Sequence, residues 1–117
     1  MAAILAIEDE LLVRLVIVEA LADAGHTVLE ANDGEEALGL LRSGKTVDLI
    51  LTDVRMPRMD GFALVRAARA LHPEVPVVFM TGYAGSAIRP EFPHAVVLDK
   101  PFSPEELLKT VNRVLAI

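Results

Sequence analysis

The sequence predicts an α/β domain in which five parallel strands form an open, doubly wound sheet with helices on both faces. Short apolar runs of strand length alternate with segments of helical composition along the whole chain. All but one of these runs are almost continuously apolar, which is typical of strands buried on both faces of a parallel sheet. Helix-capping signals lie between several of the runs, so we expect helices to connect consecutive strands.

The five expected strands are the apolar runs themselves. They cover Ala3–Ile7, Thr27–Ala31, Asp48–Thr52, Val75–Met80 and Ala95–Leu98. Because each pair of consecutive parallel strands needs a right-handed crossover, few topologies remain. The flavodoxin-like strand order 2-1-3-4-5 is a common solution for five strands.

The helical segments between the strands carry recognisable start and stop signals. Gly25 stands where the first helix ends, and Asp33 with Glu36 and Ser103 with Glu106 have the spacing of capping boxes. The expected helices are Glu10–Ala24, Asp33 to about Arg42, Gly61–Leu71, a short helix within Ala84–Glu91, and a last helix that follows Ser103.

Length and composition exclude several classes of protein. The chain has 117 residues, of which 53% are hydrophobic, so we expect one folded domain over residues 1–117. A net charge of −6 disfavours binding to nucleic acid or to an anionic membrane. The absence of cysteine excludes disulfides and thiolate chemistry. The apolar runs are too short to span a bilayer and no signal peptide is present, so we expect a cytoplasmic protein.

Polar residues gather where the predicted strands end. In an open parallel sheet, ligands bind outside the carboxyl ends of the strands, at the point where the strand order reverses. The residues at these ends are Glu8 and Asp9, Asp53, Thr81, and Asp99 with Lys100. Crowded carboxylates repel one another, and a bound divalent cation removes the conflict. Oxygen donors without histidine or cysteine favour Mg²⁺, with Mn²⁺ as the other candidate.

A divalent cation, a lysine and a hydroxyl together suit the binding of a phosphoryl group. At such a site Asp53 is a candidate nucleophile that would form an aspartyl phosphate. The histidines lie away from this edge of the predicted sheet and are not expected to be catalytic.

The motifs at the strand ends resemble those of receiver domains of two-component response regulators, and the resemblance covers the whole chain in order. The matching segments are Glu8-Asp9, Asp53-Val54-Arg55-Met56-Pro57-Arg58-Met59-Asp60-Gly61, Thr81-Gly82 and Lys100-Pro101-Phe102. Each motif is weak alone, but four motifs at four strand ends are highly specific.

The resemblance implies a Mg²⁺ site. Asp9 and Asp53 would ligate the cation directly, together with the backbone carbonyl of Arg55. Glu8 stands where an aspartate is common in the family, and it would act mainly through a metal-bound water.

The resemblance also implies a phosphoacceptor function. Asp53 would take a phosphoryl group from a phosphohistidine on a sensor histidine kinase or a histidine phosphotransfer protein. Thr81 and Lys100 would contact the phosphoryl oxygens, and the Lys100-Pro101 bond is expected to be cis. Such a domain catalyses its own phosphorylation and dephosphorylation and is not a conventional enzyme; its downstream partner is left open.

The sequence departs from the family pattern between Thr81 and Lys100. Val97 occupies a position where many receivers carry Tyr or Phe, a ring that moves inward when the threonine moves towards the phosphoryl group. The segment between Thr81 and Lys100 is also short for the family. Tyr83 is therefore the candidate switch residue alongside Thr81, with a shield for the acyl phosphate as the alternative role.

The first helix is apolar beyond one face, because Leu11, Leu12, Leu15 and Val18 widen the usual stripe. Either these are tolerated surface side chains, or they form a surface for a partner next to Asp9.

Two other functions fit these residues less well. A binding module that has lost phosphorylation is disfavoured by the complete set of Asp9, Asp53, Thr81 and Lys100. A phosphatase of the haloacid dehalogenase type needs a second aspartate two residues after the nucleophile, and that position is Arg55. We expect a stand-alone regulator, since Met1 directly precedes the first strand, but residues 97–117 also resemble the receivers that end hybrid histidine kinases.

Overall fold

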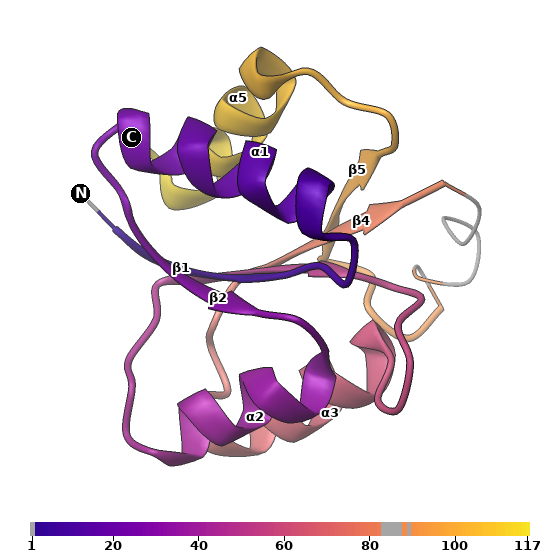
Figure 1. The fold of residues 1–117 in the computed structure, drawn as a ribbon. Helices are drawn as coiled ribbons and strands as arrows, with labels where there is room; N and C mark the ends of the chain where they lie inside the picture. Colours follow the sequence, from indigo (N-terminus) through magenta and orange to yellow (C-terminus); the bar gives the residue numbers. More distant parts are fainter. Residues whose placement is uncertain (1, 83–87, 89) are drawn as a thin grey trace.

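The computed structural model describes residues 2–82, 88 and 90–117 and contains one parallel sheet of five strands (Figure 1). The strand order is β2-β1-β3-β4-β5, so the predicted topology is confirmed. The strands are β1 (Ala3–Ile7), β2 (Thr27–Ala31), β3 (Leu49–Asp53), β4 (Val77–Thr81) and β5 (Val96–Asp99).

Three strands are displaced from their predicted bounds by one or two residues. Asp53 and Thr81 are the last residues of β3 and β4, because Asp53 still pairs with Met80 and Thr81 with Asp99. At its other end, β4 begins only after Pro76, which has no N–H group to donate to a neighbouring strand. Of the candidate site residues, Asp53 and Thr81 are therefore held by the sheet itself.

Helices cover both faces of the sheet, as Figure 1 shows. One face carries α1 (Leu11–Asp23) and α5 (Pro104–Leu115), and the other carries α2 (Gly34–Arg42) and α3 (Gly61–Leu71). The helix expected within Ala84–Glu91 falls largely outside the described residues.

Of the two predicted capping boxes, only one is complete. Ser103 accepts a hydrogen bond from Glu106 N, and the Glu106 side chain accepts one from Ser103 N. Asp33 caps α2 by accepting from Glu36 N at 2.9 Å, but Glu36 Oε1 accepts from Asn32 N instead of Asp33 N. The Glu36 side chain extends past Asp33 to the amide before it, so the capping box predicted for Asp33 and Glu36 is only half formed.

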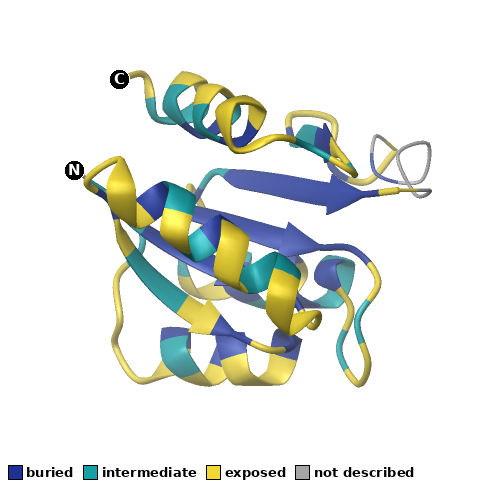
Figure 2. Ribbon diagram, turned by 45° about the horizontal axis from the view of Figure 1, so that its top comes forward, coloured by how far each residue is buried: buried dark blue, intermediate teal, exposed yellow. Residues whose placement is uncertain are grey.

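Two apolar cores sandwich the sheet (Figure 2). The core beneath α1 and α5 contains Ile17, Leu21, Leu107 and Val111, all fully buried. The opposite core contains three phenylalanine rings in mutual contact, with centroids 5.3–5.8 Å apart: Phe62, Phe79 and Phe92. With both faces covered, the carboxyl ends of the strands are the edge where polar groups can meet a ligand.

Within the described residues, none of the helices has the length and hydropathy to cross a membrane.

Candidate functional site

Three carboxylates meet at the carboxyl ends of β1 and β3, which are neighbours in the sheet. One oxygen from each of Glu8, Asp9 and Asp53 lies within 4.8 Å of the other two, and we call this trio the acidic cluster. Glu8 is fully buried, Asp53 is 9% exposed and Asp9 is exposed. The structure thus brings together three of the residues that the sequence singled out.

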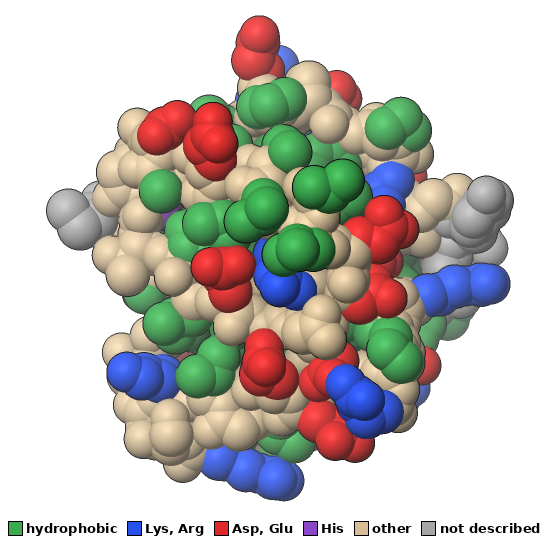
Figure 3. Space-filling view, viewed as in Figure 1, with side chains coloured by type: hydrophobic (Ala, Val, Ile, Leu, Met, Phe, Trp, Pro, Cys, Tyr) green, Lys and Arg blue, Asp and Glu red, His purple; other side chains and the backbone are tan. Residues whose placement is uncertain are grey.

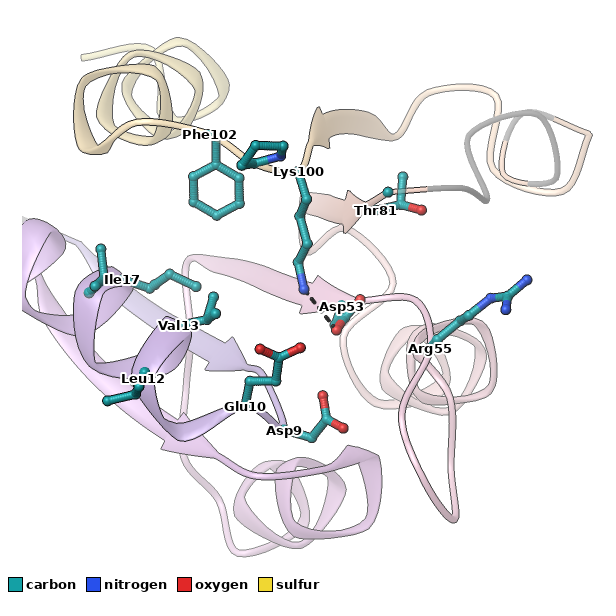
Figure 4. A pocket seen from close by; sticks show the side chains of 13 residues that line it. Asp9, Glu10, Leu12, Val13, Ile17, Asp53, Arg55, Thr81, Lys100 and Phe102 are labelled. Carbon is teal, nitrogen blue, oxygen red and sulfur yellow. Dashed lines mark hydrogen bonds and ion pairs between the residues drawn. The ribbon is translucent and has the colours of Figure 1, made fainter.

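Lys100 joins two members of the acidic cluster. Its Nζ donates to Glu8 Oε1 at 2.7 Å and to Asp53 Oδ2 at 3.0 Å, and Figure 4 shows the lysine pointing down onto Asp53. Lys100 N also donates to Thr81 O at 2.9 Å, which fixes the lysine beside the end of β4. The Lys100-Pro101 peptide bond is cis, as the resemblance implied.

Glu8 accepts hydrogen bonds at both carboxylate oxygens and at its backbone carbonyl. Besides the bond from Lys100, its Oε2 accepts from Glu10 N at 3.1 Å, and its carbonyl accepts from Arg14 Nη1 at 2.8 Å. Both carboxylate oxygens therefore already have donors, which fits an indirect role for Glu8 towards a cation better than direct ligation.

The electrostatics of the site favour an additional cation. Burial raises the pKa of the Glu8 carboxyl, and the hydrogen bond from Lys100 offsets this only in part. Burial opposes the charged form of Lys100 as well, but its hydrogen bonds to Glu8 and Asp53 prevail and raise its pKa. Three carboxylates thus face one ammonium group, and a divalent cation would balance the remaining negative charge. The all-oxygen donor set suits Mg²⁺ or Mn²⁺.

A cavity of about 770 Å³ opens beside the acidic cluster. Its polar end contains Asp9, Asp53, Thr81 and Lys100, and its apolar end lies against α1 and Phe102 (Figure 4). The apolar lining comes from Leu12, Val13, Val16, Ile17, Pro101 and Phe102. The cavity thus extends from Asp53 to the apolar side chains of α1.

The backbone around Asp53 is tightly supported. The buried Thr52 hydroxyl donates to Asp53 O at 2.9 Å, and Gly61 N donates to Val54 O at 2.9 Å. A Cβ at position 61 would overlap Asp53 O, so only glycine lets the chain return so close to the strand end. Arg55 also lines the cavity, but its side chain points away from the acidic cluster (Figure 4).

Of the two residues expected to switch the domain, Thr81 lies among the residues that the structure describes. Thr81 ends β4 and is 4% exposed in the cavity wall. Tyr83 lies outside the described residues. Val97 is half-buried and packs against the core that contains the phenylalanine rings, opposite Phe79 in the β4–β5 register.

Sequence reasoning missed the contacts that arginines make around the site. Arg14 was not singled out, and Arg58 was noted only as part of a motif, although its side chain pairs with Asp33. No local pattern signals such contacts between residues far apart in the chain. Asp60, also noted only as part of that motif, caps α3 by accepting from Ala63 N at 2.9 Å. His26 is buried between Ala2 N and Asn112 Oδ1, away from the cavity.

Comparison with known proteins assigns the chain to a family whose fold and acidic site agree with this geometry. Residues 4–112 match the family model for the response regulator receiver domain. The chain belongs to this family. It is therefore a receiver domain of two-component signalling, a regulatory phosphoacceptor domain.

Relatives of this receiver domain occur both as parts of much longer proteins and as a protein of about the same length. It is 42% identical to the sensor kinase CckA of Brucella abortus over 97% of the chain, but it spans only 12% of that kinase. It is 36% identical to the response regulator receiver protein CpdR of the same species, and the match covers 98% of each protein. Against the transcriptional regulator NtrC of Salmonella typhimurium the identity is 37%, over 24% of the regulator.

Solved structures give the same result. The chemotaxis protein CheY4 of Vibrio cholerae superposes with a TM-score of 0.88 at 38% identity, over 97% of this chain and 98% of the other. The receiver domain of the hybrid histidine kinase CckA superposes with a TM-score of 0.83, also at 38% identity, over 97% of this chain and 98% of that domain.

Proposed function

We propose that this receiver domain takes a phosphoryl group on Asp53 from a phosphohistidine, in a reaction that requires Mg²⁺, and that phosphorylation changes its binding to a partner protein. One observation carries the proposal. The Asp53 carboxylate ends a central strand, opens to the cavity, and lies within reach of both Lys100 and the oxygens of Glu8 and Asp9.

The cation site consists of Asp9 and Asp53, with the Arg55 carbonyl as a third donor by analogy with the family and Glu8 acting through water. Bound Mg²⁺ would neutralise charge on the phosphoryl oxygens as they approach the carboxylates. Glu8 keeps Lys100 oriented through their 2.7 Å hydrogen bond, so the lysine is in place before a phosphoryl group arrives.

The transfer step needs no other co-reactant. An oxygen of Asp53 attacks the phosphorus of the phosphohistidine, a P–O bond forms, and the P–N bond breaks with its electron pair going to the imidazole nitrogen. Lys100 and Thr81, both in the cavity wall, would contact the phosphoryl oxygens. The product is an aspartyl phosphate.

The phosphodonor is a sensor histidine kinase or a histidine phosphotransfer protein, and α1 is the surface on which we place it. Leu11, Leu12, Leu15 and Val16 form an exposed apolar patch on α1, 48–77% exposed, and we call it the α1 patch. Figure 3 shows hydrophobic side chains gathered over this helix, with acidic side chains beside them. Since Leu12 and Val16 also line the cavity, a donor seated on the patch reaches Asp53 directly.

The direct test is phosphorylation with acetyl phosphate and Mg²⁺, read by intact-protein mass spectrometry. The wild type should gain one phosphoryl group. The single variant Asp53→Asn and the double variant Asp9→Asn/Lys100→Ala should each gain little or none. Glu10→Gln is the matched control, because it removes a carboxylate from the same cavity without touching the proposed ligands. Undiminished labelling of Asp53→Asn would overturn the assignment.

The response to phosphorylation is tested at Thr81 and Tyr83. Thr81→Ala should accept the phosphoryl group but lose the change in partner binding. Tyr83→Ala should do the same if the tyrosine is the switch, whereas a variant that only loses its phosphate faster would make it a shield.

A further inference from the structure

The loop after β3, residues 54–60, is joined to α2 by contacts that the phosphoacceptor chemistry does not use. It runs from Asp53 to α3 and includes Arg55, which lines the cavity. At its far end, Arg58 contacts Asp33, the N-cap of α2, and Met59 contacts Gly34, the first residue of the helix. The shape of this loop decides where the cavity wall at Arg55 lies.

Arg58 adopts a backbone conformation that ordinary side chains disfavour, with φ at +69°. Its guanidinium is bound in that conformation: Nε donates to Asp33 Oδ2 at 3.0 Å, and Nη2 donates to the same oxygen. Asp33 is 4% exposed and is itself fixed, because its Oδ1 caps α2 through Glu36 N. The loop is thus anchored to a buried carboxylate that also caps the start of α2.

The backbone of the loop also packs on α2. A Cβ at position 34 would lie 2.6 Å from Met59 O and 2.9 Å from Met59 Cγ, so the loop fits against Gly34 only because that residue has no side chain. Gly39, in the same helix, has no atom within 4 Å of such a Cβ. The close approach is specific to the end of α2 that faces the loop.

We propose that the Asp33–Arg58 ion pair and the Gly34–Met59 contact form a clamp that holds the loop in its cation-binding shape and so sets the affinity of the acidic cluster for Mg²⁺. Asp33, Gly34 and Arg58 are positioning residues, since they act through the backbone at Arg55. The inference rests on the proposed function. A loop that is only partly in the competent shape binds a ligand with an affinity reduced by that fraction.

The experiment separates loop geometry from helix stability. Asp33→Asn keeps a side-chain oxygen for the α2 cap but weakens the ion pair. Arg58→Gly and Arg58→Asn remove the guanidinium, and both replacement residues tolerate a positive φ. Arg66→Gln is the matched control, because Arg66 is also an exposed arginine paired with a distant glutamate, and its guanidinium bonds to Glu91 and not to Asp33.

Two measurements are made on each variant: the Mg²⁺ dissociation constant by calorimetry, and hydrogen exchange of the Met59 and Gly61 amides, which are bonded to Pro57 O and Val54 O. Loss of the ion pair should weaken Mg²⁺ binding by roughly two- to fivefold and speed the exchange of both amides. The double variant Asp33→Asn/Arg58→Gly should lose no more than Arg58→Gly alone.

Gly34→Ala should weaken Mg²⁺ binding in the same direction without any change of charge, whereas Gly39→Ala should leave it unaltered. The clamp is overturned if wild type binds Mg²⁺ and Arg58→Gly binds it equally well, or if Arg66→Gln reproduces the loss. Failure of wild type itself to bind Mg²⁺ would instead overturn the proposed function.

Discussion

Helices α1 and α5 lie side by side on one face of the sheet, yet they are built in opposite ways (Figure 1). α5 has a complete capping box, a proline at its start, glutamates in its first turn and Arg113 in its last. α1 has no side-chain cap, no acidic residue in its first turn and no basic residue in its last. Local signals therefore encode α5, whereas α1 depends on what it packs against.

The outward sides of the two helices differ as well. α5 exposes charged residues such as Glu105 and Lys109, as expected of an amphipathic surface helix. α1 instead exposes the α1 patch. This difference agrees with the phosphodonor surface proposed for the outer side of α1.

The largest effect on the free energy of unfolding should come from the buried sides of α1 and α5, where the two helices are alike. Leu21 of α1 and Leu107 of α5 are both fully buried in the same core. Leu21→Ala and Leu107→Ala should each lower the free energy of unfolding by about 2–5 kcal/mol. Leu12→Ala, at a side chain that is 77% exposed, should change it by less than about 0.5 kcal/mol. Urea unfolding followed by circular dichroism measures all three; a large loss in Leu12→Ala would show that the α1 patch serves folding.

The α1 patch itself is broken by Leu12→Ser with Leu15→Ser. Transfer from a phosphorylated histidine protein should slow by about tenfold or more, because two central contacts of the interface are removed. Labelling by acetyl phosphate, which needs no docking, should keep its wild-type rate. Leu71→Ser on α3 is the control, since Leu71 is a similarly exposed leucine away from the site. Equal slowing with acetyl phosphate would contradict a docking role.

The contrast between α1 and α5 also explains what the sequence could predict. The buried strands were evident from their continuous apolar runs, and the cap of α5 from the spacing of Ser103 and Glu106, because each signal is local. The grouping of Glu8, Asp53 and Lys100 followed from topology, since parallel strands bring their carboxyl ends to one edge.

Other features depended on contacts that no local pattern encodes. The strand register decided that Asp53 and Thr81 belong to β3 and β4. The reach of one side chain decided that Glu36 bonds Asn32 N. The pairing of Arg58 with Asp33, 25 residues away, needed the packed positions of α2 and the loop after β3.

A smaller effect should distinguish the starts of the two helices. Ser103→Ala removes the hydroxyl that accepts from Glu106 N and should cost about 1 kcal/mol of unfolding free energy. Glu10→Ala should cost nothing or stabilise the protein slightly, because Glu10 makes no side-chain cap bond and adds charge beside the acidic cluster. Chemical denaturation at neutral pH compares the two. A loss in Glu10→Ala that equals the loss in Ser103→Ala would show that α1 does have a cap.

The smallest effect is a change with pH in the free energy of unfolding. It should distinguish α2, whose N-cap Asp33 is charged, from α5, whose N-cap Ser103 is neutral. The Glu36 amide and then the Arg58 guanidinium lower the pKa of Asp33 in the folded state. A lowered carboxyl pKa contributes stability that is complete above the unfolded value, about 3.9, and is lost as the pH falls through the folded value. The stability difference between wild type and Asp33→Asn should therefore shrink below about pH 4, whereas the Ser103→Ala difference should stay constant.

Urea unfolding from pH 7 to pH 3 measures both differences. The effect is small because the Arg58 side chain is 57% exposed and water screens its charge. An Asp33→Asn difference that does not change with pH would show that the cap acts through its hydrogen bond alone.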